Sequence, residues 1–454
     1  MARRSAAAYP QPVTSAPLTR RAIFAQAWPI MLGQTTVPLV GLVDTAVIGR
    51  TGDAAALAGV ALGTTVINLV FWTFGFLRMG MTGMTAQAEG AGDAREVEAM
   101  LLRGVVAGVV LGAILFALQI VLIPIAFETL AGGGALDDAA RGYVGARFLG
   151  APASLAVFAI NGWLLGRGRT RAALALQVVM NLVNIALDLL FVWHFSMGAR
   201  GVGLGTACAE WISLAVGLVI AGRGLDWRRI LSPELFGGGA LKRLFAVNAD
   251  IMVRTIALLL LFVWFTNAGA RLGATALAAN HVLMQFVSVS AFVLDGFAFT
   301  AESRVGNAIG AGSRAGVVRA IRLTGEFSLA AGIGFALLFL ALGTPLIALF
   351  ASNQGVRLQA MAMLPFAAVI PAIGVPAWLL DGIFIGATRG RALRNAAIVA
   401  TILYIATDLA LRSFGESGIW WALMASYLYR AGALGAHLPG LLRTIEVAEP
   451  VSAT

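Results

Sequence analysis

The 454-residue chain combines 59% hydrophobic residues with only 12% charged residues, and its formal net charge is +10. Soluble globular proteins carry about 25% charged residues, so this composition excludes a chain that faces water on every side. A single cysteine, Cys208, and three histidines far apart in the sequence exclude a disulfide framework and a thiol metal motif. Residues 1–19 lack the apolar run of a signal peptide and are expected to form a disordered cytoplasmic tail.

Apolar segments long enough to cross a hydrocarbon core of about 30 Å follow this tail. Twelve are expected, near residues 24–48, 58–88, 99–126, 139–166, 171–194, 202–222, 242–269, 276–304, 316–350, 357–387, 391–413 and 418–442. Turn residues separate them, such as the glycines at 132–134 and 237–239, because irregular backbone cannot lie in lipid. The chain is therefore predicted to be an all-α polytopic membrane protein with twelve transmembrane helices.

Lys and Arg residues are divided unequally between alternate loops. With the N-terminus inside, 23 of them fall in cytoplasmic segments and seven, including Arg147, fall on the opposite side. Because positive residues concentrate in short cytoplasmic loops, both termini are expected in the cytoplasm and the protein in the inner membrane. The same bias explains the positive net charge without a nucleic-acid partner.

The two halves of the chain resemble each other at an offset of 220 residues. Asp188 corresponds to Asp408, and Gly90-Ala91-Gly92 recurs as Gly310-Ala311-Gly312. Because each repeat holds six segments, an even number, both halves have the same topology, with a pseudo-two-fold axis along the membrane normal. Such parallel repeats build transporters that rock around a central cavity, although a duplicated channel or structural protein would show the same repeat. The expected domains are an N-lobe at 20–222, a cytoplasmic linker at 223–241, a C-lobe at 242–445 and a C-terminal tail at 446–454.

Polar side chains inside the N-lobe helices indicate a buried site. An ionisable group at the bilayer centre costs at least about 2.5–3.5 kcal/mol on insertion scales, so such groups are either paired or functional. Asp44 lies late in the first helix. In the fifth helix, Gln177, Asn181, Asn184 and Asp188 fall on one face, which cannot point at lipid.

A coupling site for H+ or Na+ is predicted at Asp44, Asn184, Asp188 and Thr206. Two carboxylates close together in a low dielectric do not ionise together easily, which permits reversible protonation. The same oxygens could coordinate Na+. Hydrogen bonding between helices without transport is the alternative. Asp44 aligns with Phe265 in the second half, so this carboxylate is not part of the shared scaffold.

The C-lobe has a polar face of its own on the eighth helix, with His281, Gln285, Ser288, Asp295 and Glu302. Arg254 in the seventh helix is expected to pair with Asp295, either statically or in coupling, and Glu302 is a further coupling candidate. The candidate substrate-cavity residues are Gln34, Asn68, Gln177, Asn181, Gln285, Asp295 and Arg254. Pro29 and Pro38 interrupt the first helix and are predicted to form a hinge.

At these residues the chain resembles the multidrug and toxic compound extrusion (MATE) family, in particular its DinF branch. The resemblance covers residues 18–445 and rests on Trp28-Pro29-Ile30-Met31, Val43-Asp44-Thr45-Ala46-Val47-Ile48-Gly49-Arg50, Ala86-Gln87-Ala88-Glu89-Gly90-Ala91-Gly92 and Arg304-Val305-Gly306-Asn307. It implies two six-helix lobes around a V-shaped cavity and coupling through Asp44, Asn184 and Asp188, with Thr206 as a further ligand. The seventh-helix glutamate of the family's eukaryotic branch is absent here, which favours the N-lobe carboxylates.

The function expected is antiport, with H+ favoured over Na+, of amphipathic and often cationic compounds by a monomer that contacts membrane lipid and needs no cofactor. A flippase for lipid-linked precursors and an organic-anion exporter are the alternatives. A flippase would favour several cationic residues in the cavity, where only Arg78 and Arg254 are candidates. An intramembrane enzyme is not expected, because the one adjacent acidic pair, Asp137-Asp138, is expected in an external loop.

Overall fold

The computed structural model describes residues 18–130, 134–223 and 238–446, and these residues form helices without any strand. The tails expected at 1–19 and 446–454 lie outside the described residues except for positions 18, 19 and 446. Most of the linker expected at 223–241 also lies outside them, and its last four residues belong to a helix that begins at Gly238. The N-lobe consists of α1 (Arg20–Gly49), α2 (Ala54–Thr73), α3 (Phe76–Gly90), α4 (Ala94–Leu130), α5 (Ala135–Phe148), α6 (Ala151–Gly166), α7 (Thr170–Asp188), the π-helix η1 (Leu189–His194) and α8 (Gly198–Gly222). The C-lobe consists of α10 (Gly238–Arg271), α11 (Ala274–Gly310), α12 (Arg314–Phe350), α13 (Gln354–Gly386), α14 (Gly390–Ala410), the 3-10 helix η3 (Arg412–Phe414) and α15 (Gly415–Glu446).

Every expected membrane segment corresponds to a helix or to a consecutive helix pair. In the described part of the chain, ten spans are long and apolar enough to cross a membrane, and one of them, Ala54–Gly90, joins α2 and α3. If α5 and α6, which are bent by 52° relative to each other, are counted together as one span, the number of spans in this part of the chain rises to eleven. The twelfth expected segment is α15, a helix of 32 residues. It is not among the spans that are long and apolar enough by this measure.

Polar residues outside the apolar segments set several helix starts. The side chains of Thr19, Asp53, Ser313 and Asn353 each accept a hydrogen bond from a backbone N–H in the first turn of α1, α2, α12 and α13. Such caps satisfy N–H groups that have no partner within the helix. The helices therefore extend beyond the apolar segments that predicted them.

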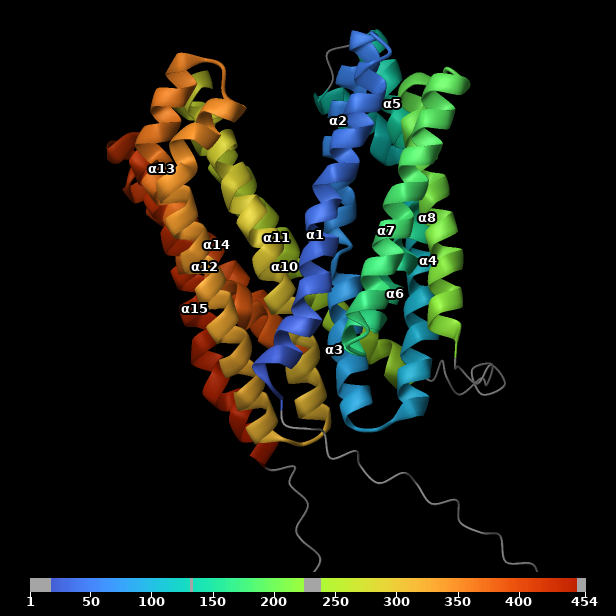
Figure 1. Ribbon diagram of the computed structural model, residues 1–454, viewed down its shortest axis with the longest axis vertical. Coiled ribbons are helices and arrows are strands. Elements are labelled where there is room, and N and C mark those ends of the chain that lie inside the picture. Colours follow the sequence, from blue (N-terminus) through green and yellow to red (C-terminus); the bar gives the residue numbers. More distant parts are fainter. Residues whose placement is uncertain (1–17, 131–133, 224–237, 447–454) are drawn as a thin grey trace, which may run out of the picture.

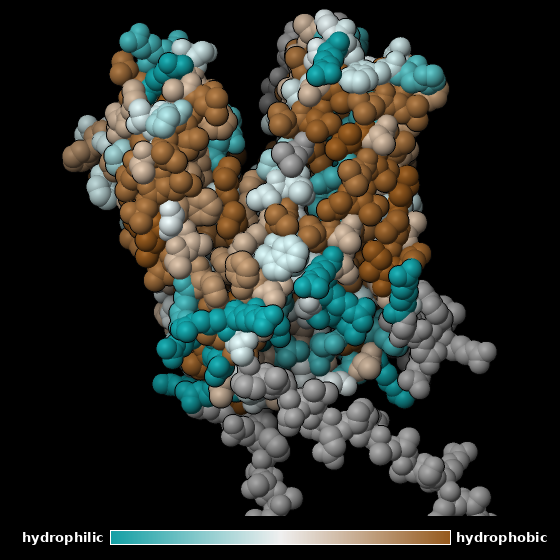
Figure 2. Space-filling view, viewed as in Figure 1, coloured by the Kyte–Doolittle hydropathy of each residue, from teal (hydrophilic) through white to brown (hydrophobic). Residues whose placement is uncertain are grey.

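The two lobes form a V. Figure 1 shows them in contact at the end where α1 begins and α15 ends, which we call the base, and apart at the opposite end. In Figure 2 a hydrophobic belt covers both lobes, whereas hydrophilic residues gather at the base and at the open end. This distribution is the one that a bilayer selects, with the gap between the lobes open on one side.

The repeated Gly-Ala-Gly motifs meet at the base. A Cβ added to Gly90 would lie 1.9 Å from the carbonyl oxygen of Asn307, and one added to Gly310 would lie 2.0 Å from that of Gln87. The end of α3 thus packs backbone to backbone against the end of α11. Gln87 also donates a hydrogen bond to the carbonyl of Gly386 (2.9 Å). Small residues in equivalent places let the two lobes approach this closely.

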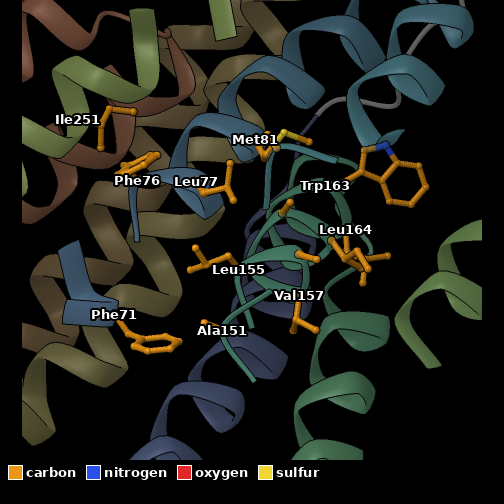
Figure 3. Packing of buried hydrophobic residues seen from close by; sticks show 14 of the residues in the cluster. Phe71, Phe76, Leu77, Met81, Ala151, Leu155, Val157, Trp163, Leu164 and Ile251 are labelled. Atoms are coloured by element: carbon orange, nitrogen blue, oxygen red, sulfur yellow. The ribbon is translucent and has the colours of Figure 1, made fainter. Parts of the chain in front are cut away.

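The main hydrophobic core lies in the N-lobe and continues across the base. In α6, Leu155 and Trp163 are fully buried, and Trp163 donates to the carbonyl oxygen of Val97 (2.7 Å). Figure 3 shows part of this cluster, with Met81 of α3 near Trp163 and with Ile251 from the C-lobe. A second cluster fills the C-lobe. Two packed cores joined at the base are suited to move as two bodies.

Candidate functional site

Two carboxyl groups face each other inside the N-lobe, where α1 packs against α7. Asp44 is 6% exposed and Asp188 is fully buried. Their side chains are in hydrogen-bonding contact with each other. The Oδ1 atom of each has no hydrogen-bond donor among the described residues. Because an ionised carboxylate only accepts hydrogen bonds, these oxygens can be satisfied by a shared proton, a cation or a water molecule.

Asn184 and Thr206 complete the arrangement around Asp188. The Asn184 Nδ2 donates to Asp188 Oδ2 (3.1 Å) and to Thr206 Oγ1 (3.0 Å). Thr206 gives its own proton to the carbonyl oxygen of Val202 (3.1 Å), so its oxygen can accept from Asn184. In this orientation Asn184 directs its N–H groups at Asp188 and Thr206, and its carbonyl oxygen is buried without a donor among the described residues.

The backbone of α8 closes one side of the site. A Cβ added to Gly205 would lie 2.0 Å from Asp188 Oδ1, so only glycine leaves room for the carboxyl group. Directly after Asp188 the helix continues as η1, and wide turns of this kind often occur at functional positions. Trp193 in η1 donates to the carbonyl oxygen of Val47 (3.1 Å), which ties this turn to α1 near Asp44.

Arg147 is a residue of the site that the sequence reasoning missed. It was expected in an outer loop, but it is buried in α5 and forms an ion pair with Glu210 of α8 (3.0 Å). Ser154 also donates to Glu210. The guanidinium interacts electrostatically with Asp44 and Asp188, so it contributes positive charge near the carboxyl pair. The signal was available, since Arg147 falls inside the apolar segment expected at 139–166.

The polar face of α7 forms a seam toward α1. Gln177 Nε2 donates to Asn181 Oδ1 (2.9 Å), and Asn181 Nδ2 lies 3.5 Å from the carbonyl oxygen of Thr36. Gln177 and Gln34 line a cavity of about 60 Å³ beside Pro29. A line of polar groups thus extends along α7 from this cavity to the carboxyl pair.

The C-lobe charges pair differently from the expectation. Arg254 forms its ion pair with Asp381, not with Asp295. Asp295 instead accepts a hydrogen bond from Gln34 of α1, and Glu302 pairs with Arg78 of α3 (3.2 Å). The expected ion pair between Arg254 and Asp295 is not formed, because Arg254 pairs with Asp381, although Arg254 still interacts electrostatically with Asp295. Both carboxylates of α11 bind N-lobe residues across the interface.

The remaining predicted residues are not gathered at one place. Asn68 and Gln285 are exposed, and neither lines the 60 Å³ cavity or a second cavity of about 420 Å³ that Arg254, Asp295 and Glu302 help to line. Gln285 contacts His281 (3.3 Å between the side-chain nitrogens). Helix α1 is continuous through Pro29 and Pro38, so their role as a hinge stays a prediction.

Comparison with known proteins agrees with this architecture. The MatE family profile matches residues 29–190 and 251–409. The chain is 37% identical over 418 residues to DNA damage-inducible protein F of Escherichia coli (strain K12), covering 92% of this chain and 91% of the relative. It is 30% identical over 436 residues to the probable multidrug resistance protein NorM of Deinococcus radiodurans, covering 92% and 94%.

A solved structure shares the fold. It is described as the outward-facing conformation of a multidrug resistance MATE family transporter of the MOP superfamily. The TM-score is 0.83 at 16% identity, and the match covers 94% of this chain and 97% of that one. The profile match extends over both lobes, and two relatives match over nearly their whole length. The chain therefore belongs to the MatE family, and it is a membrane transporter rather than an enzyme.

Proposed function

We propose that the protein is an H+-coupled antiporter that expels small amphipathic compounds, with Asp44 and Asp188 as the proton-binding pair. The observation that carries this proposal is the buried contact between the two carboxyl groups, each with an oxygen that lacks a donor. One shared proton would supply the missing donor, and its loss would leave two repelling charges. The pair therefore has two electrostatic states with different preferred separations.

The orientation of Asn184 supports H+ over Na+ as the coupling ion. Asn184 directs N–H donors at Asp188, whereas Na+ would need oxygen ligands at that position. Arg147 interacts electrostatically with both carboxyl groups, and its charge opposes the binding of either cation, so it does not select between H+ and Na+. A neutralising proton needs no space beyond the two oxygens.

The coupling path that we propose runs through α1. Loss of the proton would separate Asp44 from Asp188 and displace α1 from α7. Gln34 lies ten residues before Asp44 on the same helix and binds Asp295 of the C-lobe. A bend at Pro38, between Gln34 and Asp44, would therefore transmit the change of charge to the interface between the lobes. Alternating access then follows from rocking of the two lobes about the base.

The orientation belongs to the same proposal. The excess of Arg and Lys places the base, with both termini, in the cytoplasm, and the gap between the lobes opens to the outside. We propose the inner membrane as the location and a monomer as the working unit, because one chain already holds both lobes. The belt in Figure 2 is the surface that would contact lipid.

Transport into proteoliposomes tests this function. A fluorescent lipophilic cation would be followed under an imposed pH gradient and, separately, under an imposed Na+ gradient, with Asp44→Asn beside the parent. We expect transport driven by the pH gradient alone, and none in Asp44→Asn. Transport driven only by Na+, or undiminished in Asp44→Asn, would contradict the proposed coupling site.

An organic-anion exporter remains a second candidate, because one observation favours it. The C-lobe cavity of about 420 Å³ is lined by Arg254 and Arg430, which could bind an acidic group, as well as by the carboxylates of Asp295, Glu302 and Asp381. Export of acids would use the same proton site and the same rocking motion. The two candidates differ only in the charge that the cavity selects.

A further inference from the structure

Another cavity, of about 570 Å³, lies at the base of the C-lobe, where α14 begins and α15 ends (Figure 1). We call it the base cavity. Its lining comes from the beginning of α10, the turn between α13 and α14, the first turns of α14 and the end of α15. Its size falls within the range of about 300–1,000 Å³ that is usual for small-ligand sites. It shares no residue with the carboxyl pair of the N-lobe or with the C-lobe cavity of about 420 Å³, so it is a separate site.

Positive charge exceeds negative charge along the base cavity. Asp250 is the only acidic residue among the described residues that line it, and Arg394 already neutralises this carboxylate (2.6 Å). Arg389 and Arg391 also line the cavity, and both are exposed. Within the described part of the chain neither forms an ion pair, and Arg389 makes one side-chain hydrogen bond, from Nη2 to Thr444 Oγ1 (3.1 Å). Two guanidinium groups therefore have donors left for an anion in the cavity.

The helix faces that line the base cavity continue as exposed apolar faces toward the middle of the membrane. On α14, Val399 and Ile402 follow Asn395 of the cavity lining by four and seven residues, and they are 46% and 60% exposed. On α10, Val253 follows Asp250 by three residues and is 36% exposed. Helices α10 and α14 also pack against each other. A charged group in the cavity is thus continuous with an apolar surface on which acyl chains can lie.

We propose that the base cavity binds the phosphate headgroup of an anionic phospholipid, with Arg389 and Arg391 as ligands of the phosphate and the acyl chains along α10 and α14. A planar guanidinium can donate two parallel hydrogen bonds to one phosphate group. The start of α14, which no side chain caps, adds backbone N–H donors at the same place. Basic pockets between membrane helices on the cytoplasmic side are suited to such headgroups, and the orientation proposed above puts the base on that side.

A soluble phosphate compound shares the chemistry of the headgroup but not its chains. Such a compound would contact the two arginines and leave the apolar faces of α10 and α14 unused. A phospholipid would use both, because its chains already lie in the bilayer beside these helices. Competition between the lipid and free phosphate therefore distinguishes the two sources. The site does not depend on the coupling ion, since Asp44 and Asp188 lie in the other lobe.

Native mass spectrometry of the full chain in a neutral detergent measures this binding. The protein would be titrated with dioleoylphosphatidylglycerol or with dioleoylphosphatidylcholine, which have the same acyl chains, and the affinity for the first bound lipid would be determined. We expect phosphatidylglycerol to bind about tenfold more tightly or better, because the choline group places a positive charge beside the guanidinium groups. Inorganic phosphate at a concentration equal to that of the lipid should not displace phosphatidylglycerol.

The double variant Arg389→Gln with Arg391→Gln is decisive. Both side chains are exposed, so we expect it to fold, and it should weaken phosphatidylglycerol binding roughly 30-fold, the effect of two charges at a membrane surface. The matched control is Arg169→Gln with Arg171→Gln, which removes two exposed arginines from the same positions of the N-lobe repeat, outside this cavity. It should change the affinity by less than about threefold. Gly440→Glu adds a negative charge to the cavity wall at a position with open space and should also weaken binding, more than Gly440→Gln does.

Three results would overturn the proposal. One is a parent protein that binds phosphatidylcholine as tightly as phosphatidylglycerol, a measurement that needs no variant. Another is an equal loss of affinity in the N-lobe double variant, since the lipid would then be attracted by the basic surface in general. The third is displacement of the lipid by an equal concentration of inorganic phosphate, which would assign the site to a soluble compound. Because binding is measured without a gradient, Asp44→Asn should bind the lipid like the parent, so this proposal and the proposed transport function fail separately.

Discussion

The two lobes place an aspartate at the same position of their repeat and surround it differently. In the C-lobe, Asp408 accepts hydrogen bonds from Trp264 (2.9 Å) and from Arg271 (3.0 Å). In the N-lobe, its counterpart Asp188 faces a second carboxyl group, Asp44. Asp408 thus has a guanidinium as its partner, whereas Asp188 faces a second acidic group. One scaffold therefore holds an ion-paired carboxylate in one lobe and, in the other, the carboxylate that we propose to exchange a proton.

The different surroundings of the two aspartates correspond to a few sequence differences between the repeats. At an offset of 221 residues, Phe265 stands where the N-lobe has Asp44, and Arg271 corresponds to Arg50, which is exposed at the end of α1. Between the repeated aspartate and the glycine that starts the next helix, the N-lobe also has three more residues than the C-lobe, and η1 accommodates them. The extra turn therefore marks the lobe that we expect to bind protons.

Replacing the exchangeable carboxylate should have the largest effect. We expect Asp188→Asn to reduce pH-driven transport in proteoliposomes to the level of protein-free vesicles, because a neutral amide cannot release a proton. Asp408→Asn, the matched change in the C-lobe, should keep pH-driven transport. An equal loss of pH-driven transport in both variants would mean that the two aspartates have the same role in transport.

A bulkier residue beside Asp188 should produce the next largest effect. Gly205→Ala would place its Cβ 2.0 Å from Asp188 Oδ1 and so displace the carboxyl group from Asp44. We expect the rate of pH-driven transport to fall about tenfold, the effect of an interaction worth roughly 1.4 kcal/mol. If the repeats are aligned on Gly198 and Gly415, the C-lobe already has Ala422 at this position. Ala422→Gly is therefore the control, and it should leave the transport rate within about twofold.

Removing the guanidinium from the C-lobe aspartate should affect stability more than transport. Asp408 is 2% exposed and the Arg271 side chain is 37% exposed. We expect Arg271→Gln to lower the free energy of unfolding by about 1–3 kcal/mol, because a buried carboxylate loses its charged partner. Thermal unfolding in detergent measures this loss. Unchanged stability would show that Trp264 alone satisfies Asp408.

The smallest effect is expected at Thr206. Thr206→Val removes the acceptor of one Asn184 hydrogen bond and costs about 1 kcal/mol, or roughly a fivefold change in rate. Thr206→Ser keeps the hydroxyl and should transport like the parent. A complete loss of transport in Thr206→Val would instead indicate that the hydroxyl binds the coupling ion directly.

Several features of the candidate site were predictable because they are local. Asn184 and Asp188 are four residues apart on one helix, so the helical period alone places them on one face. Their contact with Asp44 was a hypothesis from the cost of burying charge in lipid. The Arg254–Asp295 pairing failed because several acids were available in the C-lobe, and helical periodicity does not rank partners on different helices.

By itself the sequence determined the helical membrane fold, its duplication and the positions of its intramembrane charges, because hydropathy and periodicity act along the chain. Only the tertiary structure decided which charges meet. Arg147 with Glu210 and Arg430 beside Asp381 are separated by 63 and 49 residues, and no local pattern relates them. Such pairs depend on how helices pack in three dimensions, where a rotation of one helix changes every partner. This packing makes one repeated aspartate a fixed ion pair and leaves the other beside a second carboxyl group.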